Sequence, residues 1–354
     1  MRQRWTLFLA ISILWAGISC GAISANAAPG DVQKELVYVN ENTVVLVDLV
    51  NNRVELADLI NRRFASLSKN NDRILDVSVL KSPQKIVLLQ QQKDKKIRKT
   101  IFSYTASLIG ESVIPLKIAE STTVKWAAPT GKVNERIMVQ NSNNFSLYQY
   151  PWRKPVATYN ATIKDNGYES ISVQDWDFVG YPNLAIKYQA QGIMSNDHFV
   201  KTVNLYSKKE TLLQNFNTDF QLKFTGSDLA LFTSYVYQAV PAHVNRPDAA
   251  SAQQVYRRIN MDTGKETASL TQIFTDQTEP AGWQTEYIND QIFVGNLGEQ
   301  TWSLYSKEGR QLVAGQIWPK KNNSQFLGYR NSSMTAYFLD NSTGQATIIV
   351  VPVQ

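Results

Sequence analysis

One pattern constrains this chain more than any other. A hairpin of two short apolar strands around a polar turn recurs seven times between Thr43 and Val351. The copies lie at 44–56, 100–114, 145–156, 202–210, 255–265, 302–310 and 336–345. Short runs of β-branched and aromatic residues that end in Asn, Asp, Gly or Lys are typical of strands joined by tight turns. The turns follow each other at intervals that average about 49 residues, so the chain is a series of similar units.

The period predicts the architecture. Four-stranded propeller blades take roughly 40 to 50 residues each, so we expect an all-β fold, a β-propeller of seven blades with four antiparallel strands; six or eight blades are the alternatives. A sandwich or a stacked β-solenoid could also hold many short strands. The even period and the lack of a strict short repeat favour the ring. The segment 283–318 shows the unit most clearly, with strands at 285–288, 291–295, 302–305 and 311–314.

Two further expectations concern the ends and the helices. A propeller removes exposed sheet edges when its terminal strands pair in one blade, and the candidates are Glu35 to Val39 and Ile348 to Val351. Little helix is expected. The best helical candidate, Val54 to Leu67, can also be a strand that runs into a short helix or a loop.

One stretch resembles a known family. Trp126-Ala127-Ala128-Pro129-Thr130-Gly131-Lys132 precedes a strand at Arg136 to Val139. It is similar to the repeat of TolB-like propellers, in which a Trp-Ser-Pro-Asp-Gly-Lys turn joins the first two strands of a blade. The stretch has one extra residue and covers a single blade. The resemblance implies the propeller fold and a habit of binding partners, and it implies no reaction.

The first 27 residues predict a signal peptide. Arg2 and Arg4 precede an apolar core from Leu7 to Ile18, and Ala25-Asn26-Ala27 supplies a cleavage pattern. Residues 28–354 then form one propeller domain. The alternative is an uncleaved anchor. Later in the chain no apolar run approaches the roughly 20 residues that a spanning helix needs.

Cys20 is the only cysteine in the chain. Ile18-Ser19-Cys20 resembles a bacterial lipoprotein site, but Gly17 stands where that pattern has an apolar residue. We therefore expect a secreted or envelope-associated protein, with a lipid anchor at Cys20 as the lesser alternative. In both cases a disulfide, a thiol nucleophile and a cysteine metal site are excluded.

The charge excludes one class of partner. The chain carries +6, which becomes +4 without Arg2 and Arg4. Such a weak field suits loose contact with an anionic envelope or polysaccharide and falls far short of a nucleic-acid-binding stripe. We expect a monomer that binds a protein or polysaccharide at the cell envelope.

The topology of a blade predicts where ligands bind. Loops between second and third strands share one face with the connections between blades, and long loops on a rigid scaffold usually carry binding. The extended loops expected on that face are 91–99, 191–199 and 239–253, together with the connections 161–176 and 271–283.

Six residues near that face are candidate ligand-binding residues. His198 and His243 are the only histidines; they are either a metal-binding or acid–base pair or two exposed polar loop residues. Metal-binding spacing is missing, so no metal and no cofactor is predicted. Tyr168, Trp176 and Trp283 could stack on sugar rings beside the carboxylate of Asp175, or the tryptophans could pack between blades.

Two charged sets complete the candidates. The basic run of Lys93, Lys95, Lys96, Arg98 and Lys99 is either a solvated hairpin tip or a contact for an anionic polymer. The carboxylates near possible inner strands are Asp76, Asp175, Asp177, Asp219 and Glu286.

These observations favour a binding function. The chain lacks a nucleophile elbow, a phosphate loop and a dinucleotide fingerprint, so no catalytic residue is assigned. We expect an exported, non-catalytic propeller that binds a protein or glycan. The alternative is a glycoside hydrolase or lyase that uses carboxylates in the central channel.

Overall fold

The computed structural model describes residues 34–69, 71–127, 135–164, 167–192, 196–216, 219–225, 228–236, 252–273, 282–322, 324–340 and 346–353. Within these residues the chain forms 28 strands, two short 3-10 turns (Pro319–Asn322 and Asn331–Ser333) and no α-helix. None of these residues belongs to a helix long and apolar enough to cross a membrane. The predicted signal peptide and Cys20 lie outside the described residues.

Seven antiparallel sheets follow one another along the chain. Blade 1 contains β1 (Glu35–Asn40), β2 (Thr43–Asp48), β3 (Arg53–Asp58) and β4 (Arg63–Ser66). Blade 2 contains β5 (Arg73–Lys81), β6 (Gln84–Gln91), β7 (Ile97–Phe102) and β8 (Leu108–Ile114). Blade 3 contains β9 (Thr123–Ala127), β10 (Arg136–Asn141), β11 (Asn144–Gln149) and β12 (Pro155–Asn160). Blade 4 contains β13 (Ser170–Phe178), β14 (Asn183–Gln191), β15 (Asn196–Asn204) and β16 (Glu210–Phe216).

The last three blades are less uniform. Blade 5 contains β17 (Gln221–Thr225), β18 (Asp228–Phe232), β20 (Ala252–Asn260) and β21 (Glu266–Ile273). Blade 6 contains β22 (Gly282–Ile288), β23 (Gln291–Asn296), β24 (Thr301–Ser306) and β25 (Gln311–Ile317), and β19 (Tyr235–Val236) joins it as a fifth strand beside β22. Blade 7 contains, among the described residues, three strands: β26 (Ser324–Arg330), β27 (Thr335–Asp340) and β28 (Thr347–Pro352).

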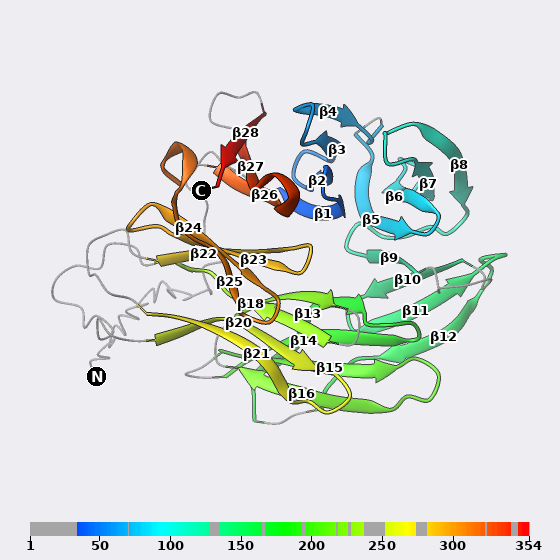
Figure 1. Cartoon of the computed structure of the whole chain (residues 1–354). Helices are drawn as coiled ribbons and strands as arrows, with labels where there is room; N and C mark the ends of the chain where they lie inside the picture. Colours follow the sequence, from blue (N-terminus) through cyan, green and yellow to red (C-terminus); the bar gives the residue numbers. More distant parts are fainter. Residues whose placement is uncertain are drawn as a thin grey trace, which may run out of the picture.

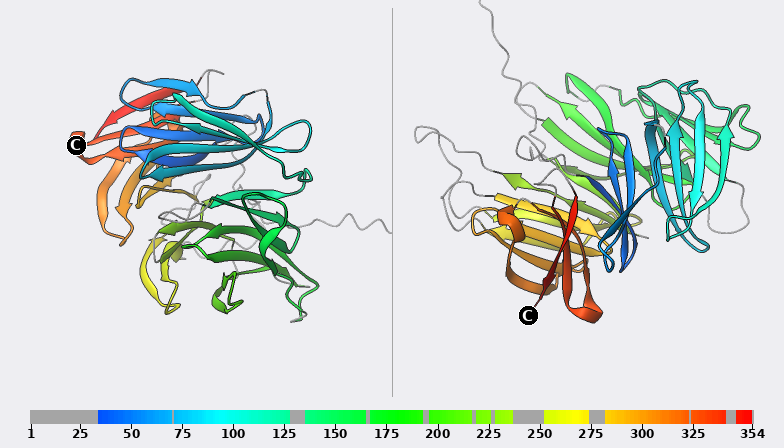
Figure 2. Two further views of the ribbon diagram at one scale, coloured as in Figure 1. Left: turned by 90° about the vertical axis from the view of Figure 1, so that its right-hand side faces the viewer. Right: turned by 90° about the horizontal axis from the view of Figure 1, so that it is seen from above.

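The protein is a seven-bladed β-propeller, as the hairpin period predicted. The colours in Figure 1 run once round the ring, and the red blade 7 lies next to the blue blade 1 in Figures 1 and 2. All seven predicted hairpins are antiparallel pairs, each in a different sheet. The segment Val54 to Leu67 is not a helix: it contains β3, a turn and β4, because alternate residues such as Val54 and Leu56 are buried against the next blade.

The core of the protein lies between the blades. Six clusters of buried apolar side chains fill the wedges, for example Val45 of blade 1 against Ile86 of blade 2, and Leu147 of blade 3 against Ile186 of blade 4. Burial of each such side chain contributes about 1.5 to 3 kcal/mol. Each blade therefore depends on its neighbours to bury its apolar side chains.

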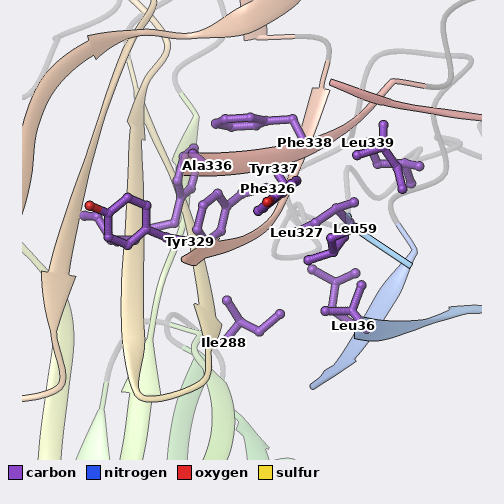
Figure 3. Close-up of a cluster of buried hydrophobic side chains, with 14 of the residues drawn as sticks. Leu36, Leu59, Ile288, Phe326, Leu327, Tyr329, Ala336, Tyr337, Phe338 and Leu339 are labelled. Atoms are coloured by element: carbon purple, nitrogen blue, oxygen red, sulfur yellow. The ribbon is translucent and has the colours of Figure 1, made fainter. Parts of the chain in front are cut away.

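The predicted closure by terminal strands is wrong. Strand β1 pairs with β2, and β28 pairs with β27, so the two ends lie in separate sheets. Side-chain packing joins the ring instead. One cluster contains Leu36 of blade 1, Ile288 of blade 6 and Phe338 of blade 7 (Figure 3). The rings of Phe293 and Phe326 stack there with centroids 4.7 Å apart, which joins blades 6 and 7.

Strand direction divides the turns between two faces. The β6–β7, β14–β15 and β18–β20 loops open on one face together with the connections between blades, and we call this the loop face. The first long loop is described in full between Gln91 and Ile97. Residues 193–195 and 237–251 of the other two lie outside the described residues.

Candidate functional site

Polar and charged side chains gather along the inner rim of the ring. The first strands of neighbouring blades contact each other, so they lie innermost. Four of these strands, β5, β9, β22 and β26, carry a charged or amide side chain that reaches the next blade. Lys187 on β14, the second strand of blade 4, and Asp219, just ahead of β17, make the same kind of contact. We call the six residues with such contacts the inner polar ring: Asp76, Lys125, Lys187, Asp219, Glu286 and Gln325.

Asp76 on β5 joins blade 2 to blade 3. Its Oδ2 accepts a hydrogen bond from the backbone N–H of Trp126 and another from the Ser78 hydroxyl, both at 2.8 Å. Burial raises the pKa of Asp76 to about 6, although both hydrogen bonds and the charge of Lys125 oppose the rise. The carboxyl therefore exchanges its proton near pH 6.

Lys125 on β9 joins blade 3 to blade 4. Its Nζ donates to the backbone carbonyl of Trp176 and lies 3.5 Å from Oδ2 of Asp177. Burial lowers the pKa of Lys125, but the charges of Asp177, Asp175 and Asp76 raise it more, so the pKa lies above its usual value. The lysine stays charged inside the rim.

Lys187 on β14 joins blade 4 to blade 5. It is buried, and its Nζ donates to Oδ1 of Asp219 at 2.5 Å and to the carbonyl of Phe220. Burial raises the pKa of Asp219, but the hydrogen bond and charge of Lys187 and the charge of His198 outweigh it, so the pKa lies below its usual value. Removing either partner of such a buried ion pair is strongly destabilising, because it leaves the other charge buried without compensation.

His198 lies in the same cluster. Its Nδ1 is 3.6 Å from Oδ1 of Asp219 and 3.3 Å from Oε1 of Gln174. Burial lowers the pKa of His198, and the charge of Asp219 only partly reverses this. The imidazole is therefore neutral at pH 7.

Glu286 and Gln325 join the last two blades and return to the first. Burial raises the pKa of Glu286 to about 7, against the charge of Lys223 and a hydrogen bond with Gln325. The Gln325 amide then pairs with the backbone of Lys34, ahead of β1: Nε2 donates to the Lys34 carbonyl at 2.6 Å, and Oε1 accepts from the Lys34 N–H at 3.2 Å. The inner polar ring thus reaches blade 1.

The contacts of this ring explain what the inner carboxylates do. Asp76, Asp177, Asp219 and Glu286 each interact with a polar group of a neighbouring blade or blade connection. Asp175 is exposed, and its Oδ1 accepts from the N–H of Trp176. Four of the five carboxylates singled out in the sequence therefore hold blades together. Among the described residues no group of His, Cys, Asp and Glu side chains could hold a metal ion.

The predicted aromatic residues lie in different environments. Trp176 is 1% exposed, packs edge-on against Phe145 at 5.3 Å between centroids, and donates from Nε1 to Oε1 of Gln140 at 2.7 Å. It fills a wedge between blades 3 and 4, which was the alternative weighed for it. Tyr168 donates to Oδ2 of Asp197 at 2.6 Å.

The other predicted site residues are dispersed. Trp283 lies on β22 in blade 6, whereas Tyr168, Asp175 and Trp176 lie on or just before β13 in blade 4. His198 is not at a loop tip: it is 2% exposed, on β15 and opposite Gln189 of β14. His243 lies outside the described residues, so the histidine pair stays a prediction.

Strand alternation splits the basic run. Arg98 Nη1 lies 2.8 Å from Asp72 Oδ2, while Lys99 Nζ lies 2.6 Å from Glu135 Oε1 of blade 3. The two cations therefore serve different neighbours.

Lys125, Lys187 and Gln325 were not among the residues predicted from the sequence. A signal was present, because Lys125 and Lys187 interrupt the apolar runs around Val124 and Ile186. A lysine in a strand that is otherwise buried needs an anionic partner.

No known protein family matches the chain, and no curated protein sequence matches it. Solved structures are similar over most of its length. Hydrazine synthase of Kuenenia stuttgartiensis is 12% identical with a TM-score of 0.48, over 93% of this chain and 100% of that one. The β-propeller domain of the Trilobed protease from Pyrococcus furiosus is 9% identical with a TM-score of 0.46, over 89% and 91%. An uncharacterized protein of Listeria monocytogenes is 9% identical with a TM-score of 0.46, over 89% and 93%.

Proposed function

We propose that this propeller is a non-catalytic binding module whose loop face recognises a protein or glycan at the cell envelope. The observation that carries the proposal is the structural use of the inner carboxylates. Asp76, Asp219 and Glu286 are engaged with neighbouring blades. A catalytic acid or nucleophile has to be available to substrate instead.

The loop face supports the same reading. The rigid ring below it is made of seven packed blades, and loops held by such a scaffold are where binding residues usually lie. The predicted signal peptide at 1–27 is the basis for the envelope location. Because the small net charge of the chain gives only a weak electrostatic field, the ligand is recognised by direct contacts rather than by bulk charge.

Thermal unfolding of the purified protein tests the proposal. Envelope glycans, wall fragments and envelope proteins are added in turn. A ligand of the folded state raises stability by about 2.7 kcal/mol at a hundredfold excess over its Kd. A shift with any of these fractions is expected.

Two charge-reversal variants test whether the ligand binds on the loop face. Lys95 is exposed in the β6–β7 loop on the loop face, and Lys154 is exposed in the β11–β12 turn on the opposite face. Lys95→Glu should weaken the shift and Lys154→Glu should leave it unchanged. The reverse result would move the binding surface to the other face and reject the proposal.

One observation favours a second candidate, a glycoside hydrolase or lyase. Asp76 and Glu286 have pKa values raised to about 6 and about 7, and a carboxyl that holds its proton near neutral pH can act as a general acid. The test is incubation with polysaccharides and detection of new reducing ends. Cleavage that Asp76→Asn or Glu286→Gln abolishes, without loss of folding, would establish this function in place of the first.

A further inference from the structure

A wide-mouthed pocket opens on the loop face where the connection between blades 1 and 2 meets the β6–β7 loop. Its volume is about 650 Å³, within the range of roughly 300 to 1,000 Å³ that is usual for ligand sites. The lining consists of Asn71, Asp72, Gln92, Lys93, Asp94 and Arg98. Sites of this size are mostly apolar, whereas all six of these side chains are polar. An occupant must therefore be polar itself.

A buried ion pair forms part of this lining. Nη1 of Arg98 lies 2.8 Å from Oδ2 of Asp72, and their side chains are 12% and 6% exposed. Glu111 lies 3.4 Å from Nε of the same guanidinium. Gln90 donates from Nε2 to the backbone carbonyl of Asp72 at 3.3 Å, which fixes the connection in place.

The β6–β7 loop is held equally firmly. The N–H of Gln92 donates to the carbonyl of Lys96 at 2.9 Å, and the Lys96 N–H donates to Oδ1 of Asp94 at 3.1 Å. The N–H of Ile118, in the next connection, donates to the carbonyl of Lys95 at 3.1 Å. A pocket with fixed walls loses little conformational freedom when it binds.

The charges of the lining balance. Lys93 and Arg98 are opposed by Asp72 and Asp94. Beside the lining, Lys96 pairs with Asp94 at 2.7 Å and Glu111 with Arg98 at 3.4 Å, so one further cation is opposed by one further anion. A charged ligand would gain little net attraction here. Amide, carboxylate and guanidinium groups each present paired donors or acceptors in one plane, which suits two neighbouring hydroxyl groups.

We infer that this pocket binds a neutral sugar, as a monosaccharide or as the end of a neutral oligosaccharide. The inference rests on the proposed function, since it names the ligand class of the loop face. Gln92 is the side chain expected to bind hydroxyls directly, because it lines the pocket and only its backbone holds the loop.

Calorimetric titration of the full protein tests the inference. The probes are glucose, N-acetylglucosamine, their β-linked disaccharides, and glucuronic acid as a charged comparison. The variant is Gln92→Ala. The matched control is Gln84→Ala, because Gln84 is an exposed glutamine at the start of β6, on the face opposite to Gln92, which follows the end of that strand.

At least one neutral probe should bind, with Gln92→Ala weakening it about 5- to 10-fold and Gln84→Ala leaving Kd unchanged. Equal melting temperatures of the two variants exclude unfolding as the cause. Binding of glucuronic acid alone, equal affinity of both variants, or no binding of any probe would overturn the inference. If an envelope fraction still stabilises the protein in a Lys95-dependent way, the proposed function stands while the neutral-sugar pocket falls.

Discussion

The side chain of Gln325 pairs with the backbone of Lys34, 291 residues away in the sequence. The amide donates to the carbonyl and accepts from the N–H of the same residue, at 2.6 Å and 3.2 Å. It thus offers Lys34 both hydrogen bonds that a neighbouring strand would supply. One side chain on β26 therefore does at the ring's inner seam what pairing of terminal strands was expected to do.

Loss of this pair should destabilise the whole ring. Gln325→Leu leaves the partly buried Lys34 N–H and carbonyl without the amide, which is expected to lower the free energy of unfolding by about 2 kcal/mol. Urea unfolding measures the change. Gln311→Leu, at an exposed position of β25, is the control and should change stability by less than about 0.5 kcal/mol. Equal effects of the two substitutions would show that the seam does not depend on Gln325.

The raised pKa of Asp76 should appear as pH dependence. The unfolded chain releases this proton near pH 4 and the folded protein near pH 6, so the folded state holds the extra proton in between. The contribution of Asp76 to stability therefore falls as pH rises from about 4 to about 6. Asp76→Asn, which can still accept both hydrogen bonds, should gain stability relative to the parent over this range and keep the gain above it.

Urea unfolding of both proteins between pH 4 and pH 8 measures the difference. Asp262→Asn is a suitable control, because Asp262 is exposed in the turn between β20 and β21. A stability difference for Asp76→Asn that shrinks as pH rises would contradict the assignment.

The pKa of His198 should depend on the positive charge of Lys187. Burial depresses the pKa of His198, and the charge of Lys187 depresses it further. Lys187→Met removes that charge and should raise the pKa of His198. Proton NMR titration follows it simply, because the chain has two histidines and His243→Gln assigns the signals. An unchanged pKa in Lys187→Met would mean that the two side chains are not neighbours in solution.

Gly295 should be intolerant of any side chain. A Cβ at this position of β23 would lie 2.0 Å from Cζ3 of Trp318, a side chain 1% exposed and fixed by its Nε1 donating to the Ser324 carbonyl at 3.1 Å. Gly295→Ala is expected to cost about 2 to 3 kcal/mol. Gly110→Ala on β8 is the matched control, since a Cβ there meets nothing within 4 Å. Thermal unfolding compares the two, and similar Tm values would refute the packing argument.

Most of the fold could be predicted because its strands and turns are specified by residues close together in the sequence. Apolar alternation and turn residues act within about ten residues, so the strands at 285–288 and 302–305 could be recognised without any knowledge of their neighbours. For Val54 to Leu67 the strand alternative was right and the helix was not. Over so short a span, a strand, a turn and a second strand space their apolar residues much as a helix does.

The candidate site was predictable only in part. The carboxylates Asp76 and Glu286 could be assigned to inner strands from the repeat, but their partners come from other blades. Trp176 illustrates the same limit: its position in the strand was clear, while its burial against Phe145 depends on how blade 3 meets blade 4.

The sequence by itself determined the repeat and the face on which the long loops open, and it favoured seven blades over six or eight, because strand periodicity and turn chemistry are local. Only the tertiary structure decided how the ring closes, which charges are buried and where a pocket forms. Those features depend on side chains from different blades meeting at distances of a few ångströms, as Gln325 meets Lys34 and Arg98 meets Asp72. Their spacing along the chain, 291 residues in the first case, carries no record of the contact.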